Sequence, residues 1–145
     1  MATCKTDGQG DNQQTHMAGE FLVVGQLFKR GYQVAITMGN AKAIDSFAHN
    51  PRTGETFNIQ VKALRYKNCF DLKKEDIQPD YVYIFVFLNA PSEPEDFLIL
   101  RGQTILDDID GFYGAVYRGP KKSLRPTINY GPLMEYKDNW KLFEE

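Results

Sequence analysis

Gln60 and Lys62 are the first residues whose types and spacing could carry chemistry. Apolar and polar residues alternate over 56–63, which predicts a strand with these two side chains on one face, about 7 Å apart. Asp45 lies on a second predicted strand, over 43–48, and the turn residues between the two strands make them a hairpin. Depending on the register of that hairpin, Asp45 faces Gln60 across the ladder.

Glu20 brings a second carboxylate toward this region. It lies in a predicted helix that runs from Thr15, the expected N-cap, to Arg30. On a helical projection it falls on the arc expected to face the core, which consists of Met17, Phe21, Val24 and Phe28, with Leu27 at its edge. A buried carboxylate is costly unless it is paired or bound to a metal, so this position is unusual.

These groups together form a set of hard oxygen donors. Two carboxylates, an amide oxygen and a backbone carbonyl suit Mg²⁺, which keeps several of its waters. A neighbouring lysine can position or deprotonate a water, or stabilise charge that develops on a phosphate. Each residue also has an ordinary explanation: Glu20 pairs with a lysine, Asp45 makes a local hydrogen bond, and the polar face of the hairpin is solvated. His16, one turn before Glu20, is either at the edge of the site or a fraying end of the helix.

The remaining pattern predicts a mixed α/β domain, a central sheet of about five strands flanked by helices. Its further elements are strands over 33–38, 81–88 and 97–100 and a helix over 103–109. The strand over 81–88 is apolar on both faces, so we expect it in the centre of the sheet, covered on both sides. Residues 1–14 are polar and predict a flexible N-terminal arm, which leaves 15–145 as a single domain.

The order Glu20, Asp45, Gln60-Val61-Lys62 resembles the PD-(D/E)xK phosphodiesterase superfamily, which has a restriction-endonuclease-like core. Gln60 stands where the usual acid would be, a Q-x-K variant of the motif. The surroundings resemble the small stand-alone prokaryotic branch: Gly19-Glu20 opening the helix, Lys29-Arg30-Gly31-Tyr32 closing it, Asn40 before Asp45, and Asp138-Asn139-Trp140-Lys141-Leu142 near the end. The resemblance covers most of residues 16–143.

This resemblance implies a metal-dependent nuclease that hydrolyses phosphodiester bonds in nucleic acid, with DNA as the expected substrate. Asp45 would be the central ligand of Mg²⁺, or of Mn²⁺ in its place. Glu20, Gln60 and the carbonyl of Val61 would complete the ligand set, and Lys62 would activate water or stabilise the transition state. Because Gln60 removes one negative charge, the alternative is a catalytically weak or inactive nuclease-fold module that acts in binding or protein interaction. The residues leave DNA against RNA, and endonuclease against exonuclease, open.

Charge is distributed in a way that permits nucleic-acid binding. Seventeen basic and 19 acidic residues give a net charge of -2, which argues against a broad electrostatic binder. Basic residues nevertheless cluster after the predicted 56–63 strand and in a stretch near 120 that has no acid. The candidate nucleic-acid contacts are Arg65, Lys67, Arg118, Lys121, Lys122 and Arg125. Nucleases of this superfamily often act as homodimers or beside an accessory DNA-processing protein, since two strands need two sites.

Membrane and secretory signals are absent from the sequence. The longest apolar run, over 81–88, has eight residues, whereas a membrane helix needs roughly 18–20. Two cysteines, Cys4 and Cys69, are too few for a disulfide scaffold, so we expect thiols and a cytoplasmic protein.

Overall fold

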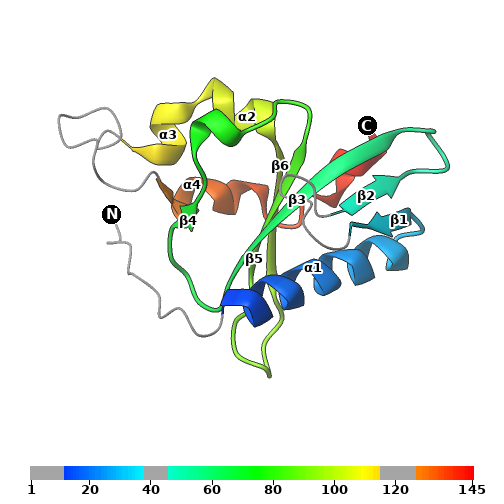
Figure 1. Cartoon of the computed structure of the whole chain (residues 1–145), viewed down its shortest axis with the longest axis horizontal. Coiled ribbons are helices and arrows are strands. Elements are labelled where there is room, and N and C mark those ends of the chain that lie inside the picture. The colour runs from blue at the N-terminus through cyan, green and yellow to red at the C-terminus, as the bar shows by residue number, and fades with distance from the viewer. Residues whose placement is uncertain (1–11, 38–45, 115–126) are drawn as a thin grey trace.

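A five-stranded mixed sheet forms the centre of the computed structural model, which describes residues 12–37, 46–114 and 127–145 (Figure 1). Its strands, in spatial order, are β1 (Gln33–Ile36), β2 (Ser46–His49), β3 (Thr56–Leu64), β5 (Val82–Phe87) and β6 (Asp96–Arg101). The β3–β5 pair is parallel, and the other three pairs are antiparallel. The predicted fold class is therefore confirmed.

Two apolar cores cover the two faces of this sheet. On one face, α1 (Asn12–Lys29) and the 3₁₀ helix η5 (Trp140–Glu144) pack with the inward residues of β3 and β5. The other face is covered by α2 (Gly102–Asp107), α3 (Ile109–Tyr113) and α4 (Tyr130–Leu133). The remaining short elements are η2 (Lys74–Asp76), η4 (Met134–Tyr136) and a small second sheet of β4 (Phe70–Asp71) and β7 (Thr127–Ile128).

The strand predictions were accurate to within a few residues. All six residues of β5 are buried, and both neighbours of this strand are hydrogen-bonded to it, as its apolar faces indicated. The middle strand of the five is nevertheless β3. The predicted helix over 103–109 is divided at Asp108, whose carboxylate accepts a hydrogen bond from the backbone amide of Gly111 at 3.1 Å and caps α3.

The orientation of α1 differs from the prediction. Its inward residues are Thr15, Gly19, Val23 and Leu27, joined by Val24, whereas Met17, Phe21 and Phe28 are exposed. The helix also begins at Asn12, so Thr15 is a buried residue within it and not the N-cap. Small side chains at 15 and 19 decide the orientation, because they let the helix approach β3 closely.

Gly19 marks the closest approach of α1 to the sheet. A Cβ atom added there would lie 2.5 Å from the Cβ of Ala63 and 3.5 Å from a methyl group of Val61. We expect Gly19→Ala to lower the free energy of unfolding by about 1–2 kcal/mol, since overpacking costs more than the gain in helix propensity. Urea unfolding measures this.

Gly25 is the matched control on the same helix. Nothing lies within 4 Å of the position its Cβ would take, so Gly25→Ala should stabilise the protomer by about 0.5–1 kcal/mol. Restoring space with Ala63→Gly should recover stability in the Gly19→Ala background. Equal effects of alanine at both glycines would contradict the close approach.

The C-terminal segment is fastened to the start of the sheet by one carboxylate. The Tyr32 hydroxyl donates to Glu144, and Arg52 donates to both carboxylate oxygens of Glu144 at 2.9 and 3.1 Å. Asn50 donates to the Phe143 carbonyl at 2.8 Å. The rings of Tyr32 and Phe57 contact Phe143, so polar and apolar contacts hold η5 in place together.

The stability of this fastening depends on pH. Burial, and then the hydrogen bond to Glu144, raise the pKa of Tyr32 from 10.0 to about 12. Because the folded pKa is the higher one, Tyr32 contributes stability that is complete below pH 10 and is lost as pH rises through 12. The hydrogen bonds from Tyr32 and Arg52 lower the pKa of Glu144, so its contribution is lost instead in acid.

Tyr32→Phe tests this pH dependence. We expect the difference in unfolding free energy between wild type and Tyr32→Phe to be constant from neutral pH to about pH 10 and to shrink toward pH 12. Urea unfolding across this range measures the difference, in which the titration of all other groups cancels. Parallel curves for the two proteins up to pH 12 would contradict the assignment.

Cys69 is buried and disulfide-bonded, so the prediction of a thiol there is wrong. The chain's other cysteine, Cys4, lies outside the described residues. Among the helices that the structure describes, none is long and apolar enough to cross a membrane.

Candidate functional site

The polar face of β3 holds two of the predicted site residues. Burial alternates along the strand: Phe57, Ile59 and Val61 are buried, while Asn58, Gln60 and Lys62 are half-buried. In the parallel register with β5, Gln60 lies beside Tyr83 and Lys62 beside Phe85. Gln60 and Lys62 therefore share one face at the margin of an apolar core, as predicted.

Glu20 lies on α1, the helix that packs against the other face of β3. Its side chain is 20% exposed, and its Oε1 atom is 2.9 Å from Nε2 of His16. On the helix it falls between the buried residues Val24 and Leu27, which accounts for its partial burial. His16 contacts Glu20 one turn along α1, at the i, i+4 spacing visible in the sequence, while its place at the edge of a site stays a prediction.

The described part of the β2–β3 ladder ends beside Gln60. Its last pair is Ser46 with Ile59. Ser46 is only 2% exposed, and its buried hydroxyl has no hydrogen-bond partner among the residues that the structure describes. Such a buried, unsatisfied group is unusual in a native protein. Asp45, the next residue toward the N-terminus, lies outside the described residues.

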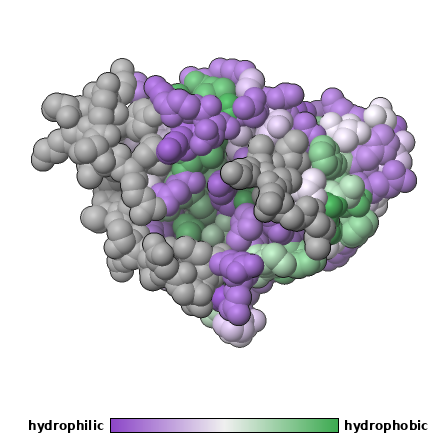
Figure 2. All heavy atoms as spheres, viewed as in Figure 1, coloured by the Kyte–Doolittle hydropathy of each residue, from purple (hydrophilic) through white to green (hydrophobic). Residues whose placement is uncertain are grey.

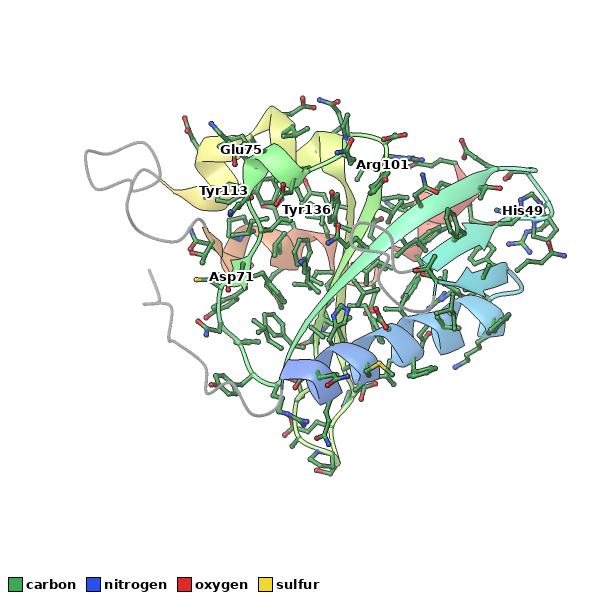
Figure 3. The ribbon with its side chains drawn as sticks, in the orientation of Figure 1. His49, Asp71, Glu75, Arg101, Tyr113 and Tyr136 are labelled. Atoms are coloured by element: carbon green, nitrogen blue, oxygen red, sulfur yellow. The ribbon has the colours of Figure 1, made fainter. Side chains whose placement is uncertain are left out.

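The structure places the described candidate residues on opposite faces of the sheet, and it brings only Gln60 and Lys62 together. Gln60 and Lys62 project from one face, and Glu20 belongs to the helix on the other. Over 12–37, 46–114 and 127–145, no group of three or more His, Cys, Asp or Glu side chains could hold a metal ion. His49 is at the turn end of the hairpin, where its Nδ1 is 2.9 Å from Thr56 Oγ1 (Figure 3).

Two of the candidate nucleic-acid contacts flank an exposed aromatic residue. Arg65, Tyr66 and Lys67 follow directly on β3, all three are exposed, and Tyr66 is 52% exposed. They line one side of an open cavity of about 800 Å³, whose other side is formed by Asn89, Ala90, Glu93, Pro94 and Asp96. Prediction from sequence missed Tyr66, although an aromatic between two cations was a usable signal. Arg118, Lys121, Lys122 and Arg125 lie outside the described residues.

Comparison with known proteins gives a likeness in structure and none in sequence. No family model matches the chain, and no curated protein matches it in sequence. The fold is similar to that of a bacterial homing endonuclease, I-Ssp6803I, with a TM-score of 0.57 and 13% sequence identity. The match covers 93% of this chain and 95% of that one, so the likeness extends over the whole fold.

Proposed function

We propose that this protein is a metal-dependent nuclease of the PD-(D/E)xK type that hydrolyses phosphodiester bonds in DNA. Its site would consist of Glu20, Asp45, Gln60 and Lys62, with the carbonyl of Val61. The observation that carries the proposal is the pairing of Gln60 and Lys62 on the half-buried face of β3, beside the end of the described β2 strand.

Asp45 precedes the described strand β2 directly in the sequence. The first residue of that strand, Ser46, is the ladder partner of Ile59, the residue before Gln60. In the proposed site, the Asp45 carboxylate would share the cation with Gln60.

The donor set at this margin fits Mg²⁺ or Mn²⁺. Glu20 supplies a half-buried carboxylate and Gln60 an amide oxygen, and both are hard oxygen donors of the kind these cations take. The unsatisfied Ser46 hydroxyl is on the face of the sheet that α1 covers, opposite to Gln60, where it could hydrogen-bond to a water bound to a metal held by Glu20. When bound, the cation would polarise a phosphoryl oxygen and lower the pKa of a water.

The chain's own residues would do the rest. Lys62, held beside Phe85 at the margin of the core, would place a positive charge against the phosphate in a setting of reduced solvent screening. His16 would orient the Glu20 carboxylate, as partners of metal ligands commonly do. Arg65 and Lys67 would bind backbone phosphates, and Tyr66 would stack on a base.

The structural likeness supports the choice of substrate. The protein with the similar fold is named a homing endonuclease, and the likeness spans nearly the full length of both chains. An endonuclease that acts on DNA is therefore the form of the proposal to test first. RNA and free strand ends are the other substrates that the assay must include.

The test is a calorimetric titration with Mg²⁺ and with Mn²⁺, on wild type and Asp45→Ala, followed by cleavage assays. Supercoiled plasmid reports endonuclease activity, end-labelled linear duplex reports exonuclease activity, and labelled RNA covers the other nucleic acid. Glu55→Ala, an exposed acid in the same hairpin, is the matched control. We expect one site in wild type and in Glu55→Ala, and loss of binding and cleavage in Asp45→Ala.

The alternative function makes a different prediction in the same experiment. If neither cation binds to wild type, with or without DNA, the nuclease proposal fails. A nuclease-fold module that acts in binding or protein interaction would then be the better description.

A further inference from the structure

The outward face of α1 is apolar, and none of the residues that the structure describes covers it. Among the residues that the structure describes, five large hydrophobic side chains are substantially exposed, and three of them are on this helix: Met17, Phe21 and Phe28. Phe21 and Phe28 each keep more than half of their surface. In Figure 2, green spheres follow the position of α1 across the front of the molecule.

Five exposed positions of α1 form one stripe with the spacing of a helix–helix contact, and exposed Gln13 and Lys29 lie beside it. The five recur every three or four residues, at Gln14, Met17, Phe21, Gly25 and Phe28. None of these carries a charge, in a chain whose charged residues make up 25% of the total. A helix that faces only water usually shows charged and polar residues on its outer side. This stripe instead has the composition of an interface, in which Phe and Met are enriched and charges are depleted.

Gly25 provides an independent observation at the middle of the stripe. Glycine in a helix interior is destabilising relative to alanine. The space around its missing Cβ is open, so nothing in the described part of the chain requires a glycine there. A second helix that crosses the stripe at this point would require one, because a small residue lets two helix axes approach closely.

We propose that the outward face of α1 is a homodimer interface, occupied by α1 of a second copy of this chain. A twofold axis places a surface against itself, so any net charge on it would be repelled, and this stripe has none. Two α1 helices packed along Met17, Phe21 and Phe28 would bury all three side chains, with Gly25 at the crossing.

The exposed apolar area is close to what a dimer needs. Taking about 200 Å² for a whole phenylalanine, the exposed parts of the stripe and of Ile36, on the same side of the sheet, give roughly 350 Å² per protomer. A standard interface buries about 800 Å² per partner, of which about 57% is apolar. A membrane surface is a poorer occupant, because helices that bind it present Lys and Arg all along their apolar face, and here Lys29 and Arg30 lie only at the C-terminal end of the stripe.

Sedimentation velocity on the full chain tests this proposal and does not depend on nuclease activity. We expect wild type to sediment at twice the mass of the 16.6 kDa chain at micromolar concentration. Phe21→Glu with Phe28→Glu should raise the dissociation constant at least 100-fold and leave a monomer. Tyr66→Glu, which removes the exposed aromatic outside the stripe, should remain a dimer.

A second, milder variant covers the case in which the double substitution unfolds the chain. Gly25→Gln favours the helix and fills the open space at the crossing, so it should weaken the dimer while circular dichroism and thermal stability show a folded protomer. A wild type that is monomeric at 100 µM would overturn the proposal. So would a dimer that survives both changes, or a monomeric wild type that binds neutral lipid vesicles through this stripe.

Discussion

Lys62→Met is expected to lower the rate of Mg²⁺-dependent DNA cleavage by about 10²–10³-fold, the usual cost of removing one group that stabilises transition-state charge. Methionine keeps the apolar stem beside Phe85 and removes only the charge, so folding should be unchanged. Cation binding should be nearly unchanged, or slightly tighter, since a positive charge has left the neighbourhood of the site. Single-turnover cleavage of labelled duplex, with calorimetry alongside, separates these effects.

Lys67→Met is the matched control for that loss. It removes the same charge from an exposed position five residues further along the chain, where Lys67 lines the open cavity. We expect weaker DNA binding with a shallower dependence on salt concentration than wild type, because one phosphate contact is lost, and a rate at saturating DNA close to wild type. If Lys62→Met, like Lys67→Met, keeps a rate close to wild type at saturating DNA, Lys62 is a DNA-binding residue and not a catalytic one.

Gln60→Glu is expected to tighten Mg²⁺ binding by about 10–100-fold. The substitution restores the carboxylate that the PD-(D/E)xK motif usually has, at a half-buried position where solvent screens an added charge incompletely. Cleavage at limiting Mg²⁺ should rise with the affinity. Calorimetric titration of both proteins at the same ionic strength gives the ratio of dissociation constants.

The control for this gain lies on the same strand. Asn58→Asp adds the same charge to the same half-buried face, about 7 Å further from Lys62. It should change Mg²⁺ affinity by less than threefold. Should Gln60→Glu leave both metal binding and cleavage at zero, Gln60 is structural, and the interaction-module function is favoured over the nuclease.

The strands could be predicted because alternate residues of a strand lie on opposite faces of the sheet. The pattern of apolar residues therefore indicates which faces are buried. Alternation over 56–63 corresponds to β3, with one side in a core and the other half-buried. The continuous apolar run that corresponds to β5 indicated that both faces of this strand are buried. The two-residue strands β4 and β7 have no such pattern, since their pairing is decided by segments more than fifty residues apart.

Which side of α1 packs against the sheet could not be predicted from hydrophobicity alone. An apolar stripe indicates that another surface packs on the helix. It does not indicate whether that surface belongs to the same protomer or to a partner. Met17, Phe21 and Phe28 were the more hydrophobic side, yet Thr15 and Gly19 face the sheet because small residues fit against Ala63. A glycine in the middle of a helix was the available signal.

The candidate site was predictable in its local parts only. The shared face of Gln60 and Lys62 follows from the two-residue period of a strand, and the contact of His16 with Glu20 from helical spacing. The position of Glu20 relative to β3 depends on tertiary packing, which local sequence patterns do not predict. The role of Asp45 remains a prediction from the motif.

The fastening of η5 has a consequence for biosynthesis. Tyr32 and Glu144 are 112 residues apart, so the ribosome produces α1 and the first hairpin long before the segment that covers them. Until Trp140 and Phe143 emerge, the apolar surface around Tyr32 and Phe57 has no cover. A nascent chain in this condition is a target for chaperones and is prone to aggregate. Slow translation late in the message would therefore lower the yield of folded protein more than slow translation early.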